Sequence, residues 1–104
     1  MAFDSSQVLR DMAAAAESVI SGDWPKVQDC VKQALKDQEE ALQDIAEARL
    51  KKELTDDELH SQLEDEKATL EAALLACRVR AKAMAQEAAN AAIQVLEKAI
   101  KAAL

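Results

Sequence analysis

One glycine and one proline, close together near the N-terminus, are the only strong helix breakers in this chain of 104 residues. They lie in the segment 21–25, and residues 24–104 contain no further glycine. Gly22 suits the left-handed conformation that often ends a helix, Asp23 suits an N-cap, and Pro25 suits a first helical turn. We therefore predict one secure break here, with long helical segments on either side.

The composition favours an all-α fold. Half of the residues are hydrophobic but only 2% are aromatic, so the apolar half consists mainly of alanine and leucine. These residues, with the abundant glutamate, lysine and glutamine, are strong helix formers. Because strand-like alternation and hairpin turns are missing from the sequence, we expect a single helical domain over residues 1–104.

The apolar periodicity predicts three helices, at about residues 4–20, 24–53 and 56–104. Asp4 or Ser5 can cap the first helix. Thr55, with Glu58 three residues later, has the spacing of a capping box, which favours a tight reversal between the second and third helices. A helix that continues through this point stays open as the alternative. The expected architecture is an antiparallel helical hairpin with a short N-terminal helix.

The third helix has more apolar surface than two neighbours of these lengths can cover. It spans about 73 Å and the second about 45 Å, so the first helix either extends the shorter arm or folds back beside the third. Beyond residue 81 the apolar arc is wide and centred on alanine. We therefore expect a bundle or coiled-coil-like homo-oligomer. The predicted self-association face consists of Leu75, Val79, Ala81, Ala85, Ala88, Ala92, Ile93, Leu96 and Ile100.

The single histidine is the centre of a weak candidate metal site. Asp57, His60 and Glu64 lie on neighbouring positions of one helix, and ferritin-like di-iron proteins place Glu-x-x-His motifs on such helices. The hairpin tip is open to water, however, and we expect Arg49 opposite the three residues, where it would repel a cation. We interpret the cluster as a solvated acidic end, with a ferritin-like site completed by dimerisation as the alternative.

The two cysteines are predicted to lie at nearly the same height on facing helices. A disulfide or redox switch between Cys30 and Cys77 is geometrically feasible. Two buried thiols that fill a core layer are the commoner arrangement. The redox state of the pair stays open. Two cysteines are also compatible with a cytoplasmic protein, since small secreted scaffolds usually carry more.

Charge and motifs restrict the function. A net charge of -7 argues against nucleic acid, and no apolar run is long enough for a membrane span. The N-terminus lacks a secretory pattern, so we expect a cytoplasmic protein. Because nucleophile and phosphate-binding motifs are missing, we expect neither an enzyme nor a cofactor. The sequence favours a structural or interaction protein that self-associates, or else a helical adaptor or chaperone that binds an amphipathic partner helix.

Overall fold

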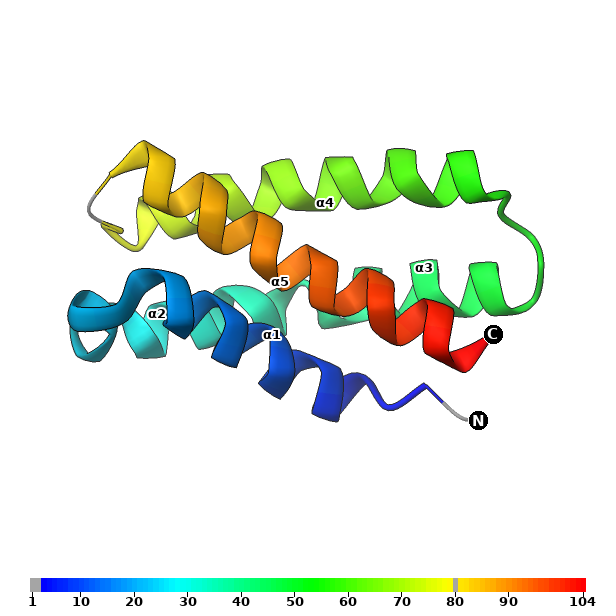
Figure 1. Ribbon diagram of the computed structural model, residues 1–104, viewed down its shortest axis with the longest axis horizontal. Coiled ribbons are helices and arrows are strands. Elements are labelled where there is room, and N and C mark those ends of the chain that lie inside the picture. Colours follow the sequence, from blue (N-terminus) through cyan, green and yellow to red (C-terminus); the bar gives the residue numbers. More distant parts are fainter. Residues whose placement is uncertain (1–2, 80) are drawn as a thin grey trace.

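The computed structural model describes residues 3–79 and 81–104, and within them the chain forms five α-helices, one short 3₁₀-helix and no strand (Figure 1). The elements follow one another as α1 (Ser5–Ile20), the 3₁₀-helix η1 (Ser21–Asp23), α2 (Trp24–Asp37), α3 (Glu39–Leu50), α4 (Asp56–Ala76) and α5 (Lys82–Ala103). The all-α prediction is thus confirmed.

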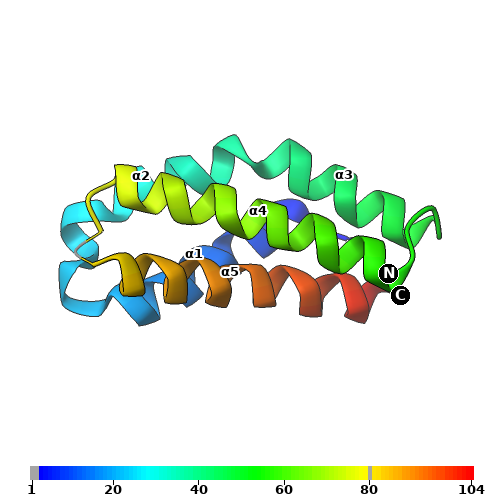
Figure 2. The same ribbon diagram turned by 90° about the horizontal axis from the view of Figure 1, so that it is seen from above.

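The helices form a bundle of four antiparallel arms in the described part of the chain, because α2 and α3 run on together as one arm (Figures 1 and 2). α5 packs most extensively against α1 and also lies along α4, while α2 contacts both α1 and α4. The bundle measures 39 × 23 × 19 Å. α1 therefore does not extend the shorter arm. It folds back, but it lies against α5 and α2 and not beside residues 68–79, where a folded-back first helix was expected.

The first turn is where the sequence predicted it, but a different residue takes the unusual conformation. Asp4 caps α1 by accepting a hydrogen bond from the backbone N–H of Gln7 at 3.2 Å. Ser21, not Gly22, has the positive φ of 58°. The Asp23 side chain makes no capping hydrogen bond to α2, whereas Pro25 does lie in the first turn. The prediction of a left-handed Gly22 and a capping Asp23 is therefore wrong.

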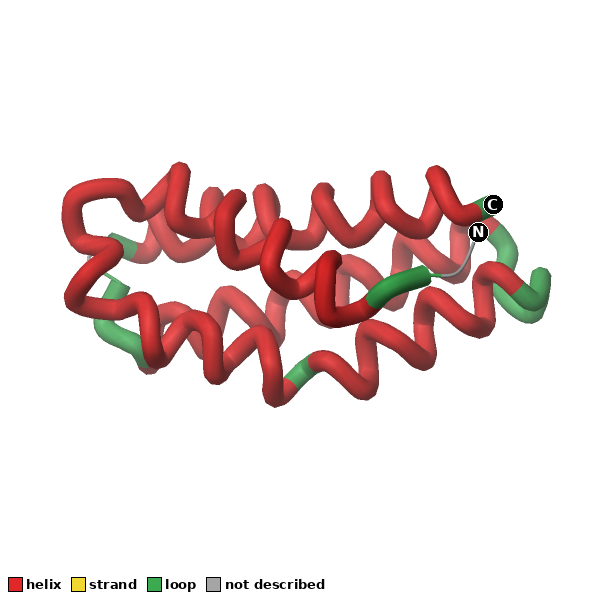
Figure 3. The backbone as a smooth tube through the Cα atoms, turned by 90° about the horizontal axis from the view of Figure 1, so that it is seen from below, coloured by secondary structure: helices red, strands yellow, loops and turns green. Residues whose placement is uncertain are grey.

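The second predicted helix, 24–53, is interrupted at one residue, Gln38, and ends at Leu50 (Figure 3). The N–H of Gln38 bonds to the carbonyl of Leu35, three residues back, so the chain tightens by one 3₁₀-type turn. The carbonyl of Gln38 then accepts from the N–H of Leu42, which restarts the α-helical ladder. The side chain of Gln38 is buried, and its Oε1 has no hydrogen-bond partner among the described residues.

The reversal before α4 confirms the predicted capping box. The Thr55 N–H donates to the Glu58 carboxylate at 2.9 Å, and the Glu58 N–H donates to the Thr55 hydroxyl at 3.1 Å. α3 ends through a left-handed Lys52, with φ 62°, and a hydrogen bond from the Glu53 N–H to the Ala48 carbonyl. This bond closes the helix end in the manner of a Schellman motif.

The predicted continuous helix 56–104 is wrong, because the chain turns back after Ala76. Arg78 adopts a left-handed φ of 65°, and the N–H of Val79 bonds to the carbonyl of Leu74 at 3.2 Å. Ala81 is extended and starts α5 without a side-chain cap. This turn lets α5 return along α4 and α1, where its wide apolar arc is buried.

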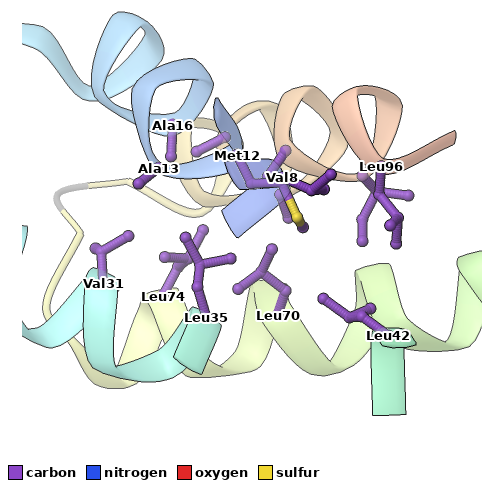
Figure 4. Packing of buried hydrophobic residues seen from close by; sticks show 14 of the residues in the cluster. Val8, Met12, Ala13, Ala16, Val31, Leu35, Leu42, Leu70, Leu74 and Leu96 are labelled. Atoms are coloured by element: carbon purple, nitrogen blue, oxygen red, sulfur yellow. The ribbon is translucent and has the colours of Figure 1, made fainter. Parts of the chain in front are cut away.

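The core runs along the length of the bundle and draws on every arm (Figure 4). Met12 of α1, Leu35 of α2 and Leu70 of α4 are almost fully buried, and Figure 4 shows their side chains pointing into the space between the helices. Leu42 of α3 and Leu96 of α5 continue this layer. None of the helices in residues 3–79 and 81–104 has the length and apolarity that a bilayer crossing requires.

Candidate functional site

An open groove between α1 and α2 has a mainly apolar lining and a volume of about 440 Å³. It exists because α1 packs mainly against α5, so its contact with α2 is less extensive. The chain's one tryptophan, Trp24, lines it at the first residue of α2. The groove is lined by Leu9, Arg10, Ala13, Ala14, Glu17, Trp24, Lys32 and Leu35.

Charged side chains border the apolar lining of this groove. Arg10 and Glu17 come from α1, and Lys32 comes from α2. Arg10 donates to the side-chain oxygen of Gln7 at 2.8 Å. Among residues 3–79 and 81–104, neither Arg10 nor Lys32 has a carboxylate within ion-pair distance. The groove thus combines an apolar floor with two cations and one carboxylate at its edge.

The sequence did not reveal this groove. A helical wheel shows which residues of one helix share a face but not how far two helices stand apart, so it cannot locate a groove between them. One signal was present in the sequence: Ala14 is a small apolar residue on the charged face of the first helix, between Arg10 and Glu17. The structure shows that Ala14 is exposed in the groove.

The three residues of the weak metal candidate lie on the solvent side of α4. The His60 Nε2 atom and a Glu64 carboxylate oxygen are 4.0 Å apart, with side chains 71% and 50% exposed. Glu64 also pairs with Lys67 at 3.0 Å, and Asp57 is exposed. Within the described residues no group of three potential ligands is close enough to hold a metal.

Arg49 lies beside this end of the bundle, but its partner is Asp56. Its guanidinium is within 2.6 Å of an Asp56 carboxylate oxygen, joining the end of α3 to the start of α4. This pair crosses the predicted reversal directly. We expected Arg49 opposite Asp57, His60 and Glu64, but it pairs with Asp56, the residue before Asp57.

Cys30 and Cys77 form a disulfide, with their Cα atoms 5.7 Å apart. Their prediction as neighbours on facing helices is confirmed, whereas the placement of both in a core layer is wrong. Cys30 is exposed on α2, and Cys77 is half-buried at the end of α4. The bond therefore joins two helices near the bundle surface.

The residues of the predicted self-association face divide into a buried group and an exposed group. Most are buried in the chain's own bundle, since α1 and α4 cover the inner side of α5. These buried residues are Val79, Ala85, Ala88, Ala92, Ile93, Leu96 and Ile100. Leu75 is 40% exposed and Ala81 is also exposed. The premise that one chain cannot cover this arc is wrong, because the turn at residues 77–81 supplies the missing neighbours.

One strip of α4 does remain exposed. Leu75 lies on its outer side with three exposed alanines that follow the helical repeat. The alanines are Ala68, Ala72 and Ala76. The strip consists of one leucine and three alanines, whereas the groove between α1 and α2 is lined by larger apolar side chains, including Trp24.

Comparison of this chain with protein-family models, with curated proteins and with solved structures finds no match. The functional assignment therefore depends on the surfaces described above.

Proposed function

We propose that the protein is a non-enzymatic helical interaction module that binds an amphipathic helix of a partner protein in the groove between α1 and α2. The observation that carries this proposal is the mainly apolar lining of an open hollow between two helices. In this lining, Leu9 and Ala14 are accessible to solvent beside the buried Trp24 and Leu35. Apolar grooves between helices receive the apolar face of a third helix in a recurring mode of peptide recognition.

The edge of the groove suggests the charge of that partner. Arg10 and Lys32 supply two cations from opposite walls, and Glu17 supplies one carboxylate. A helix with a leucine stripe flanked by glutamates would place carboxylates beside these cations. Aromatic residues are prominent among the anchors of protein interfaces, and Trp24 is the largest apolar side chain in the groove.

Self-association, the function expected from the sequence, would use only a small part of the predicted face. Leu75 is the bulky residue of that face that stays exposed, and the exposed Ala68, Ala72 and Ala76 lie beside it on α4, where a second copy could pack. Small side chains allow helices to approach closely. A second copy seated on α4 is therefore the other candidate, and cytoplasmic localisation stays a prediction.

Binding in the groove can be followed by tryptophan fluorescence. The chain has no tyrosine, so its fluorescence above the phenylalanine range comes from Trp24 alone. The probe is a synthetic amphipathic helix with a leucine stripe flanked by glutamates. We expect a saturable change in Trp24 emission on titration. The same peptide with lysine flanks is expected to bind more weakly.

Two alanine variants form a matched pair for this titration. Ala14→Glu places a carboxylate in the groove, and Ala72→Glu places one on the exposed face of α4. Both sites are exposed, so both variants should retain the fold, which circular dichroism checks. Loss of the response in Ala14→Glu alone supports the proposal. Equal responses in the two variants, or no response in the unaltered protein, would refute it.

A further inference from the structure

The disulfide opens onto a hollow at the end of the bundle where α2 begins and α4 ends. Asp23, Lys26, Val27, Cys77 and Arg78 line this hollow, which has a volume of about 540 Å³. Cys77 is the cysteine that lines the hollow, and Cys30 is exposed beside it on α2. A small thiol held in the hollow therefore meets the disulfide from the Cys77 side.

The hollow has more positive than negative charge. Lys26 lies one helical turn before Cys30 on the same face of α2, and Arg78 directly follows Cys77. In the part of the chain that the structure describes, neither cation forms an ion pair. Asp23 is the carboxylate among the lining residues. Cations beside a cysteine favour its thiolate and attract an anionic thiol.

We propose that this hollow is a thiol–disulfide exchange site for a small anionic thiol of the glutathione class, with Cys77 as the attacked sulfur. This proposal is independent of the groove between α1 and α2. It assigns the disulfide a reversible chemistry. A disulfide in a compartment that contains glutathione is typically of this transient kind.

The exchange proceeds in two balanced steps. The thiolate of the first small thiol attacks the Cys77 sulfur and forms a mixed disulfide, while the bond to Cys30 breaks. Cys30 leaves as a thiolate, one helical turn after Lys26, and takes a proton from water. A second small thiolate attacks the sulfur of the bound thiol, releasing Cys77 and a disulfide of the two small thiols. Two electrons pass from the small thiols to the protein, and the reverse reaction restores the bond.

The test measures the rate at which reduced glutathione opens the disulfide in the native protein. Samples taken during the reaction are alkylated, and mass spectrometry identifies which cysteine carries glutathione and which carries the alkyl group. We expect the rate to rise linearly with glutathione concentration. With limiting glutathione, we expect the trapped glutathione adduct on Cys77 and the alkyl group on Cys30. An adduct on Cys30, or a rate that levels off at the rate of global unfolding, would overturn the proposal.

Variants of one lysine separate the charge effect from simple access. Lys26→Gln should slow the reaction with glutathione about 1.5- to 5-fold, as expected for one exposed charge interaction, and Lys26→Arg should retain the rate. Neutral 2-mercaptoethanol should react at the same rate with both variants. Lys51→Gln, an exposed position at the opposite end of the bundle, is the matched control and should change the rate with neither reagent. An equal loss with Lys51→Gln, or with 2-mercaptoethanol, would contradict the assignment of Lys26.

Discussion

Cys30 and Cys77 are 47 residues apart in the sequence, and their disulfide ties the second helix to the end of the fourth. The bond lies where the chain turns back after Ala76 to return along the bundle. It therefore fastens a reversal after which α5 begins at Ala81 without a side-chain cap.

We predict that loss of this disulfide lowers the free energy of unfolding by about 2–4 kcal/mol, because a cross-link over a loop of this length restricts the unfolded chain. Urea unfolding of the oxidised protein and of the Cys30→Ser/Cys77→Ser variant measures the difference. The double variant should retain its helical circular dichroism. Equal stability of the two proteins would show that the bond adds nothing to the fold.

Ser21 holds a backbone conformation, φ 58° and ψ -116°, that glycine adopts more easily than serine. We therefore predict that Ser21→Gly raises the free energy of unfolding by about 1 kcal/mol, after the entropy cost of glycine is included. Gly22 has no positive φ, and an added Cβ there meets nothing within 4 Å. Gly22→Ala should accordingly not destabilise the protein. Thermal unfolding of both variants tests the assignment, and the opposite pattern would restore Gly22 as the left-handed residue.

Thr55 determines the titration of Glu58 at the start of α4. The backbone N–H of Thr55 and then its hydroxyl lower the pKa of the Glu58 carboxyl below its ordinary value of 4.5. This contribution to stability is present above pH 4.5 and is lost as pH falls through the lowered pKa. In Thr55→Ala the pKa of Glu58 should rise towards its ordinary value, and loss of the N-cap should cost about 1 kcal/mol.

A carboxyl-detected NMR titration measures this change, and Glu66 is the internal control. Burial, and then the charge of Asp65, raise the pKa of the Glu66 carboxyl above 4.5. The pH dependence of its contribution to stability is therefore opposite to that of Glu58: the contribution is present below pH 4.5 and is lost as pH rises through the raised pKa. Glu66 lies about three helical turns from Thr55, and its titration should be the same in both proteins. A Glu58 pKa that does not move in Thr55→Ala would contradict the role of the capping box.

Ala88 tests whether the alanine arc is packed inside the chain. It is fully buried, so Ala88→Leu should overpack the bundle and lower stability by about 1–3 kcal/mol. Ala72 is exposed on α4, and Ala72→Leu should change stability by less than about 0.5 kcal/mol. Urea unfolding at several protein concentrations measures both effects. A cost for Ala88→Leu that depends on concentration would indicate an interface between chains.

The helical class, the first break and the reversal at Thr55 were predictable because each has a local chemical signature. Asp4, Pro25 and the pair Thr55 and Glu58 act through hydrogen bonds or backbone restriction within a few residues of the chain. Such interactions are visible in sequence spacing.

The turn at residues 77–81 was not predictable in this way. Arg78 takes a left-handed conformation without the side-chain preference of glycine or asparagine, and Ala81 starts a helix without a capping side chain. Tertiary burial of the alanine arc on α5 outweighs the local preference for a continuous helix. The change of apolar face near residue 79 was the available signal, but it was interpreted as a need for a second chain.

The groove was missed for a related reason. Trp24 and Leu35 line the groove from α2, but the distance between α1 and α2 depends on how closely α1 packs against α5. That distance follows from the closure of the whole bundle. No local pattern around Trp24 encodes it.

The most direct test of this account asks whether α1 and α5 pack together within one chain. Isotope-filtered NMR on a mixture of labelled and unlabelled protein separates contacts within a chain from contacts between chains. We predict that methyl contacts between α1 and α5, including those of Met12 and Leu96, arise within the labelled chain alone. Contacts between Met12 of one chain and Leu96 of another would contradict the account.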